Sequence, residues 1–202
     1  IITIMKKLIF IFTGLFLMAN VASSQVDDRA VIPVAVTLNS ILRLNVSSGG
    51  NIEFNFNTLS DYENGIQTSA AYQTKFNVAS SVDWDVYMYA EEATLTGTDI
   101  IDSANEMDTD NIGYHVTSEG SGTFAITADE SNIAALDNDP SNILVGFNGT
   151  DPNAGDIEAN TFTIHWRCGT KESTEMNGQS ILQQGVAADR YATNVFLVLQ
   201  PN

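Results

Sequence analysis

Apolar and polar residues alternate along most of the chain. Successive side chains of a β-strand point to opposite faces, so each alternating run predicts a strand with one buried face. The runs occupy residues 32–38, 42–46, 52–56, 72–78, 84–88, 112–116, 124–126, 143–147, 162–168 and 191–199. About ten short strands, separated by clusters of Gly, Asn, Asp and Ser, are typical of an antiparallel β-sandwich or barrel.

Helical patterns are few and short. Residues 131–136, behind Ser131, predict one capped turn, and residues 176–184 predict a short helix or an irregular strand. No repeat of fixed period and no Pro- or Gly-rich linker divides the sequence. We therefore expect one all-β domain over residues 25–202.

The N-terminal stretch, residues 1–24, has the layout of a secretory signal. Lys6 and Lys7 precede an apolar run at residues 8–18, and small residues come directly before Gln25. The apolar run, of about 11 residues, is too short to span a bilayer, and no later run is long enough. This pattern predicts cleavage before Gln25 and a secreted mature chain without a membrane span.

The mature chain is strongly acidic. The whole sequence has 8 Lys and Arg against 25 Asp and Glu; without Lys6 and Lys7, six basic residues remain and the formal net charge is −19. Six scattered cations cannot build the basic face that binds nucleic acid or an anionic membrane surface. We therefore expect neither partner.

The acidic loops suggest a metal site. Asp137, Asp139 and Ser141 have the i, i+2, i+4 spacing at which a loop supplies oxygen ligands to Ca²⁺. The Gly and Glu that complete an EF-hand loop are missing, and Asp also favours turns by bonding its own backbone. A bound calcium ion and a plain turn both remain open, and we expect no other cofactor.

Catalytic patterns are weak. His115 and His165, the only two histidines, lack the spacing of a zinc site and fall on outward strand positions, which predicts surface or strand-face histidines. No Gly-x-Ser-x-Gly elbow occurs, and no carboxylate pair stands out as a glycosidase site. Cys168 shares the inward phase of Trp166, so it predicts a buried thiol, and a single Cys excludes an internal disulfide. We expect no enzyme and no catalytic residues.

Aromatic side chains offer a candidate ligand face. Trp84 falls on the inward phase of its strand and predicts a core residue, as does Trp166. Tyr87 and Tyr89 fall on the opposite face, where their rings could stack on a sugar. Coverage of that face by neighbouring segments is the other interpretation.

Both ends of the mature chain resemble a known family. Residues 29–38, Arg-Ala-Val-Ile-Pro-Val-Ala-Val-Thr-Leu, form an alternating apolar strand behind a polar leader. Near the end, Gly185 and Tyr191 lead into an alternating final strand, like the closing segment of many fimbrial subunits. The chain resembles secreted Bacteroidetes β-sandwich proteins with a pilin-like domain, which implies an immunoglobulin-like Greek-key β-sandwich.

The resemblance also implies a mode of assembly. Pilins of the chaperone–usher type lack one strand, and the leader of the next subunit fills the resulting groove by strand addition. The partners would be further copies or homologous subunits and a periplasmic chaperone, at the surface of a Gram-negative bacterium. The inserted side chains would be Ile32, Val34, Val36 and Leu38, and the acceptor groove would be lined partly by Val195, Leu197 and Leu199.

Two features depart from such pilins. They often carry a disulfide, which this chain cannot form internally, and the apolar pattern continues past Leu38, so the first strand could pair within its own domain. Pro33, which has no N–H, favours an edge position for that strand. We expect a structural subunit of a surface filament. The alternative is a monomeric secreted binding module for glycans, through Tyr87 and Tyr89, or for calcium-dependent adhesion.

Overall fold

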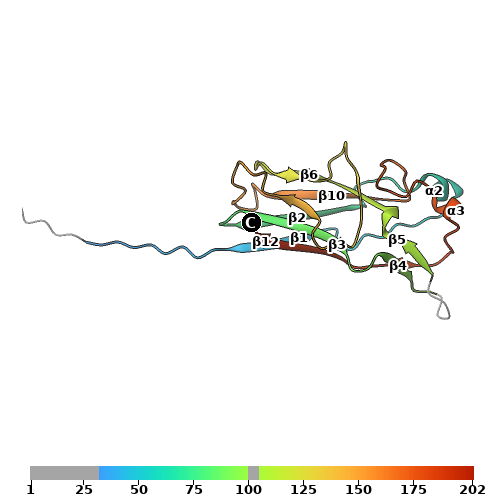
Figure 1. Ribbon diagram of the computed structural model, residues 1–202, viewed down its shortest axis with the longest axis horizontal. Helices are drawn as coiled ribbons and strands as arrows, with labels where there is room; N and C mark the ends of the chain where they lie inside the picture. Colours follow the sequence, from blue (N-terminus) through green and yellow to red (C-terminus); the bar gives the residue numbers. More distant parts are fainter. Residues whose placement is uncertain (1–31, 100–104) are drawn as a thin grey trace, which may run out of the picture. The chain divides into compact units, whose positions relative to one another are not determined.

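The computed structural model describes residues 32–99 and 105–202. The predicted signal and the polar leader lie outside these residues. The chain divides into two units, Ile1–Leu38 and Asn39–Asn202, and the second contains every strand and helix of the described part (Figure 1). Among the described residues, no helix combines the length and apolarity needed to cross a membrane.

The second unit is a β-sandwich, which confirms the all-β prediction. Its described residues form twelve strands in three antiparallel sheets. The first sheet has the order β1 (Leu42–Ser48), β2 (Gln73–Ser80), β10 (Thr161–Cys168), β6 (Ile112–Ser118), β8 (Ala134–Ala135). The second has the order β12 (Val195–Pro201), β3 (Trp84–Ala90), β9 (Ile143–Gly146), β7 (Ala125–Ile126). The third is small, with the order β11 (Tyr191–Ala192), β4 (Thr94–Gly97), β5 (Glu106–Asp108).

The core lies between the first and second sheets. Every second residue of β2 is buried, and Phe76 and Val78 have no exposed surface, as period-two alternation predicts. Trp84 of β3 packs edge-on against Phe162 of β10, with 6.0 Å between ring centroids. This contact joins the two sheets, and both predicted core tryptophans are buried.

Helices contribute little. The described part has α2 (Leu59–Asn64), α3 (Ile181–Gln184) and one 3-10 turn (Thr109–Asn111). A short helix was one of the two predictions for residues 176–184, and α3 occupies the end of that range. The helical turn predicted at residues 131–136 is wrong, because β8 forms there and pairs with β6.

Two predicted strands are not strands in the structure. Residues 32–38 belong to no sheet, and residues 52–56 are extended without a ladder. The run at 191–199 is divided between two strands: β11 pairs with β4 in the third sheet, and β12 pairs with β3 in the second.

Candidate functional site

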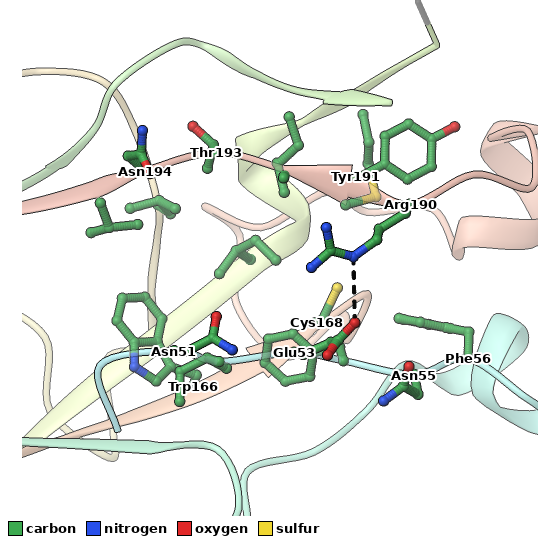
Figure 2. A pocket seen from close by; sticks show the side chains of 18 of the residues that line it. Asn51, Glu53, Asn55, Phe56, Trp166, Cys168, Arg190, Tyr191, Thr193 and Asn194 are labelled. Atoms are coloured by element: carbon green, nitrogen blue, oxygen red, sulfur yellow. Dashed lines mark ion pairs between the residues drawn. The ribbon is translucent and has the colours of Figure 1, made fainter. Parts of the chain in front are cut away.

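A groove of about 830 Å³, lined by both polar and apolar side chains, opens along the sandwich. Figure 2 shows its two walls, segment 51–57 on one side and the chain around residues 190–194 on the other. The groove floor comes from the core, including Ile112 of β6 and Ile164 and Trp166 of β10. These floor residues are themselves buried, at 8%, 0% and 6% exposed, and the two walls flank them.

Segment 51–57 reaches its position through a tight turn after β1. Gly49 has φ +68°, and a Cβ atom there would lie 1.8 Å from the Gln73 carbonyl oxygen. Only glycine can therefore occupy this position without displacing β2. Beyond the turn, half-buried Ile52, Phe54 and Phe56 alternate with exposed residues and line the groove.

The strand prediction at 52–56 is wrong because a ladder needs a neighbour. In the described part of the chain, no backbone–backbone hydrogen bond joins residues 52–56 to another segment. Their side chains hold the segment instead. The rings of Phe54 and Tyr72 stack at 4.6 Å, and Phe56 packs edge-on against Tyr62 at 5.4 Å.

The opposite wall carries an unpaired strand edge. The Asn194 carbonyl accepts from the Glu91 N–H at 2.9 Å, and the Arg190 carbonyl accepts from the Thr98 N–H at 2.9 Å. Backbone groups of successive strand residues point to opposite sides, so even-numbered residues of this wall bond to β3 and β4 and odd-numbered ones face away. We call these odd-numbered residues the open edge; they are Tyr191, Thr193, Val195 and Leu197, and all four line the groove. Among residues 32–99 and 105–202, their N–H and C=O groups have no backbone partner.

One ion pair crosses between the walls. The Arg190 Nε lies 3.6 Å from Glu53 Oε1 (Figure 2). The two side chains are 61% and 55% exposed, so the pair lies at the mouth of the groove and not on its floor.

Asp189 holds the backbone that carries Arg190. Its carboxylate accepts from the Asp99 N–H at 2.8 Å and from Asn105 Nδ2 at 2.9 Å. These hydrogen bonds, the Asp99 N–H first, lower the pKa of Asp189. The residue therefore stays ionised and keeps its contacts at neutral pH.

Cys168 lies in the groove with its thiol enclosed by apolar neighbours (Figure 2). It is a free cysteine and 2% exposed, which confirms the prediction of a buried thiol. Burial raises its pKa to about 12. A reactive thiolate is therefore not available at neutral pH.

The structure separates the predicted assembly residues by environment. Val195 and Leu197 line the groove, whereas Leu199 is half-buried on β12 and is not part of the lining in the described chain. In the first unit, the side chains of the other four residues are between 79% and 89% exposed; they are Ile32, Val34, Val36 and Leu38.

The aromatic face lies outside the groove. Tyr87 and Tyr89 are half-buried on the side of β3 opposite the core. The ring of Tyr89 lies 5.4 Å from that of Phe196, which is 40% exposed. The sequence pattern had not indicated Phe196, because it belongs to the polar phase of the final strand.

The proposed calcium residues form two turns. The Asp137 carboxylate accepts from the Asp139 N–H at 3.1 Å, and Asp139 accepts from the Ser141 N–H and hydroxyl at 2.9 and 2.7 Å. The turn interpretation accounts for all three side chains. In the described ranges, no group of three or more His, Cys, Asp or Glu residues is arranged to hold a metal ion.

The two histidines form a stacked pair on the outer face of the first sheet. Their rings lie 4.5 Å apart and 4° from parallel, and Arg167 donates to His115 Nδ1 at 2.7 Å. His115 is only 5% exposed, so of the two predicted positions, surface or strand face, it occupies the strand face. Met176, itself buried, lies against Gly113 at the Arg167 end of this face. Burial, then His165 and Arg167, lowers the pKa of His115 to about 4.

No family model matches the chain, and no curated protein matches it. Function is therefore inferred from the geometry of the groove and its open edge.

Proposed function

We propose that the protein is a structural subunit of an extracellular surface filament assembled by β-strand addition. Residues 32–38 of one copy occupy the groove of the next copy. The observation that carries this proposal is the open edge along a groove with an apolar floor, in a chain that also exposes an alternating apolar segment. The inferred location is the cell surface of a Gram-negative bacterium.

The two segments match in length. The open edge spans residues 191–197, and the exposed segment spans residues 32–38, seven residues each or about 23 Å when extended. The four even-numbered residues of segment 32–38 can then lie directly opposite the four residues of the open edge. Full overlap pairs Ile32 with Leu197, Val34 with Val195, Val36 with Thr193 and Leu38 with Tyr191.

Hydrogen-bond geometry favours an antiparallel arrangement. Residues directly opposite each other in an antiparallel pair share a face and, at alternate positions, exchange both backbone hydrogen bonds. The inward residues of segment 32–38 would therefore bond to the open edge, and Pro33 would face away from it. In a parallel arrangement, Pro33 would have to donate to the open edge with an N–H that it lacks.

Burial supplies the driving force. Each of the four exposed apolar side chains gains about 1.5–3 kcal/mol on full burial, before the cost of ordering the segment. An exposed edge above an apolar groove also invites wrong pairing before assembly. A periplasmic chaperone that covers the groove until assembly would prevent such pairing, and we therefore include it as a partner.

The test compares oligomeric states of the chain from Gln25 onward by light scattering and electron microscopy. Val34→Asn with Val36→Asn should abolish filaments or oligomers, because two polar side chains would enter the apolar groove. A matched control is Leu59→Asn with Ile157→Asn, at residues that are 63% and 52% exposed and do not line the groove. Assembly that survives the first double substitution would contradict the proposal.

A second candidate function is glycan binding at the aromatic face. The pairing of Tyr89 with partly exposed Phe196 favours it, since aromatic rings stack on sugars. Tyr89→Ala should then abolish retention on a glycan array without changing oligomeric state. Unchanged retention would exclude this face as the binding site.

A further inference from the structure

We propose that the Glu53–Arg190 ion pair is a charged strap that closes over the inserted strand and selects uncharged side chains on its outward face. This inference rests on the proposed function of the groove. It assigns to two wall residues a role in choosing which strand is accepted.

The strap has the right position for this role. Its two side chains come from opposite walls and meet at the mouth, above the apolar floor. An inserted strand would run between the walls with its apolar side chains on the floor. Its outward side chains would then face the mouth, where Glu53 and Arg190 meet.

The register places one outward residue next to the strap. With Leu38 opposite Tyr191, Thr37 lies at the level of Ala192, two residues from Arg190 along the wall. Figure 2 shows Arg190 extending from the Tyr191 region toward Glu53. Thr37 is therefore the outward residue of segment 32–38 that lies nearest to the strap, and Asn39, the residue after the segment, would lie opposite Arg190 itself.

The composition of the segment agrees with selection by charge. Its outward residues are Pro33, Ala35 and Thr37, all small and uncharged, in a chain with 25 acidic residues. A carboxylate at position 37 would compete with Glu53 for Arg190, and an ammonium group would compete with Arg190 for Glu53. Either charge would break the strap or be repelled by one half of it.

The experiment measures binding of labelled peptides to an acceptor that cannot donate its own segment. The acceptor is the chain from Gln25 onward with Val34→Asn and Val36→Asn, alone or with Glu53→Gln or Arg190→Gln. The peptides span residues 29–40 and carry Thr37, Thr37→Glu, Thr37→Lys or Ala35→Glu. Lys75→Gln provides the acceptor control, because Lys75 forms an exposed ion pair with Glu119 and does not line the groove.

The expected result is a charge-specific crossover. The Thr37→Glu peptide should bind the Glu53→Gln acceptor about threefold more tightly than the Arg190→Gln acceptor, the scale of an exposed ion pair. The Thr37→Lys peptide should show the reverse order. The Ala35→Glu peptide should show a smaller difference, because its charge lies about 7 Å farther along the strand. The Lys75→Gln acceptor should show no crossover.

Two outcomes would overturn the inference in distinguishable ways. If the ratio of Kd between the Glu53→Gln and Arg190→Gln acceptors is the same for the Thr37→Glu, Thr37→Lys and Ala35→Glu peptides, the role of the strap is contradicted and strand addition still stands. If the unmodified peptide binds no acceptor, strand addition is contradicted, and the role of the strap with it.

Discussion

The side chain of Asn153 forms the two backbone hydrogen bonds with Trp84 that a neighbouring strand would otherwise form. Its side-chain Oδ1 accepts from the Trp84 N–H at 3.0 Å, and its Nδ2 donates to the Trp84 carbonyl at 2.7 Å. Its own carbonyl accepts from the indole Nε1 at 2.8 Å. Asn153 is 2% exposed and Trp84 is fully buried. One loop side chain therefore completes the start of β3, in a chain that has no internal disulfide to do so.

Asn153→Ala should destabilise the fold by about 2–4 kcal/mol. The substitution leaves a buried N–H and a buried C=O of Trp84 without partners, and each such group costs about 1–3 kcal/mol. Chemical denaturation in urea measures the loss. The control is Asn148→Ala in the same loop, whose side chain accepts from the exposed N–H groups of Thr150 and Asp151. Equal losses for the two variants would contradict the role of Asn153.

Gly49→Ala should lower stability by at least about 2 kcal/mol, because φ +68° and the close Gln73 carbonyl both oppose a Cβ atom. It should also weaken peptide binding, since the turn positions segment 51–57. Gly50→Ala is the matched control at the next residue, where a Cβ would meet nothing within 4 Å. Urea denaturation and peptide titration of both variants provide the measurement. If the two glycines tolerate alanine equally, the turn does not position the wall.

Stability should fall as the pH drops from about 6.5 to about 4. The pKa of His115 is lowered to about 4 in the folded protein, so the unfolded chain binds more protons in this range. Once the pH has fallen below about 4, this shift lowers the free energy of unfolding by about 3 kcal/mol. His165, Arg167, Glu130 and Glu172 are the charged or titratable groups that act on His115.

Urea denaturation at several pH values measures this effect in the native chain and in His115→Gln. The variant should have a flatter profile between pH 6.5 and 4.5. The carboxylates with lowered pKa, such as Asp139 and Asp189, contribute mainly below that range. An unchanged profile in the variant would assign the acid sensitivity to other groups.

Cys168 should report occupancy of the groove. With a pKa raised from 9.0 to about 12, it should react with a thiol reagent at pH 8 roughly a thousandfold more slowly than an ordinary thiol. Insertion of a strand should slow the reaction further, because the strand covers the groove that Cys168 lines. Mass spectrometry after timed labelling, with urea-unfolded chain as reference, gives the rates. Equal rates with and without bound peptide would place the strand elsewhere.

Assembly should be faster at 0.15 M salt than at 0.01 M. Copies of the chain from Gln25 onward, with a formal net charge of −19, repel one another, over about 30 Å at 0.01 M salt but only about 8 Å at 0.15 M. Light scattering over a salt series, with and without chelator, measures the rate. Equal rates in low salt with chelator and in high salt would exclude repulsion as the barrier.

Capping boxes mark both helices, of which only the second was predicted, as one of two alternatives. Thr58 and Asp61 form a capping box that begins α2, and Ser180 and Gln183 form another that begins α3. Both follow a spacing that is visible in the sequence. The turn predicted behind Ser131 failed for a different reason. Ala134 pairs with Tyr114 of β6, and this tertiary ladder outweighs a weak local preference.

The alternation of apolar and polar residues determined the fold class and the buried faces of β2, β3 and β10. It could do so because side-chain phase is a local property of the sequence. Only the tertiary structure decided which alternating segments gain a ladder. Residues 52–56 have the pattern of a strand, but hydrogen bonds need a neighbour that the sequence does not specify. The same holds for Trp166, which the pattern assigns to the core without saying that the core opens into a groove above it.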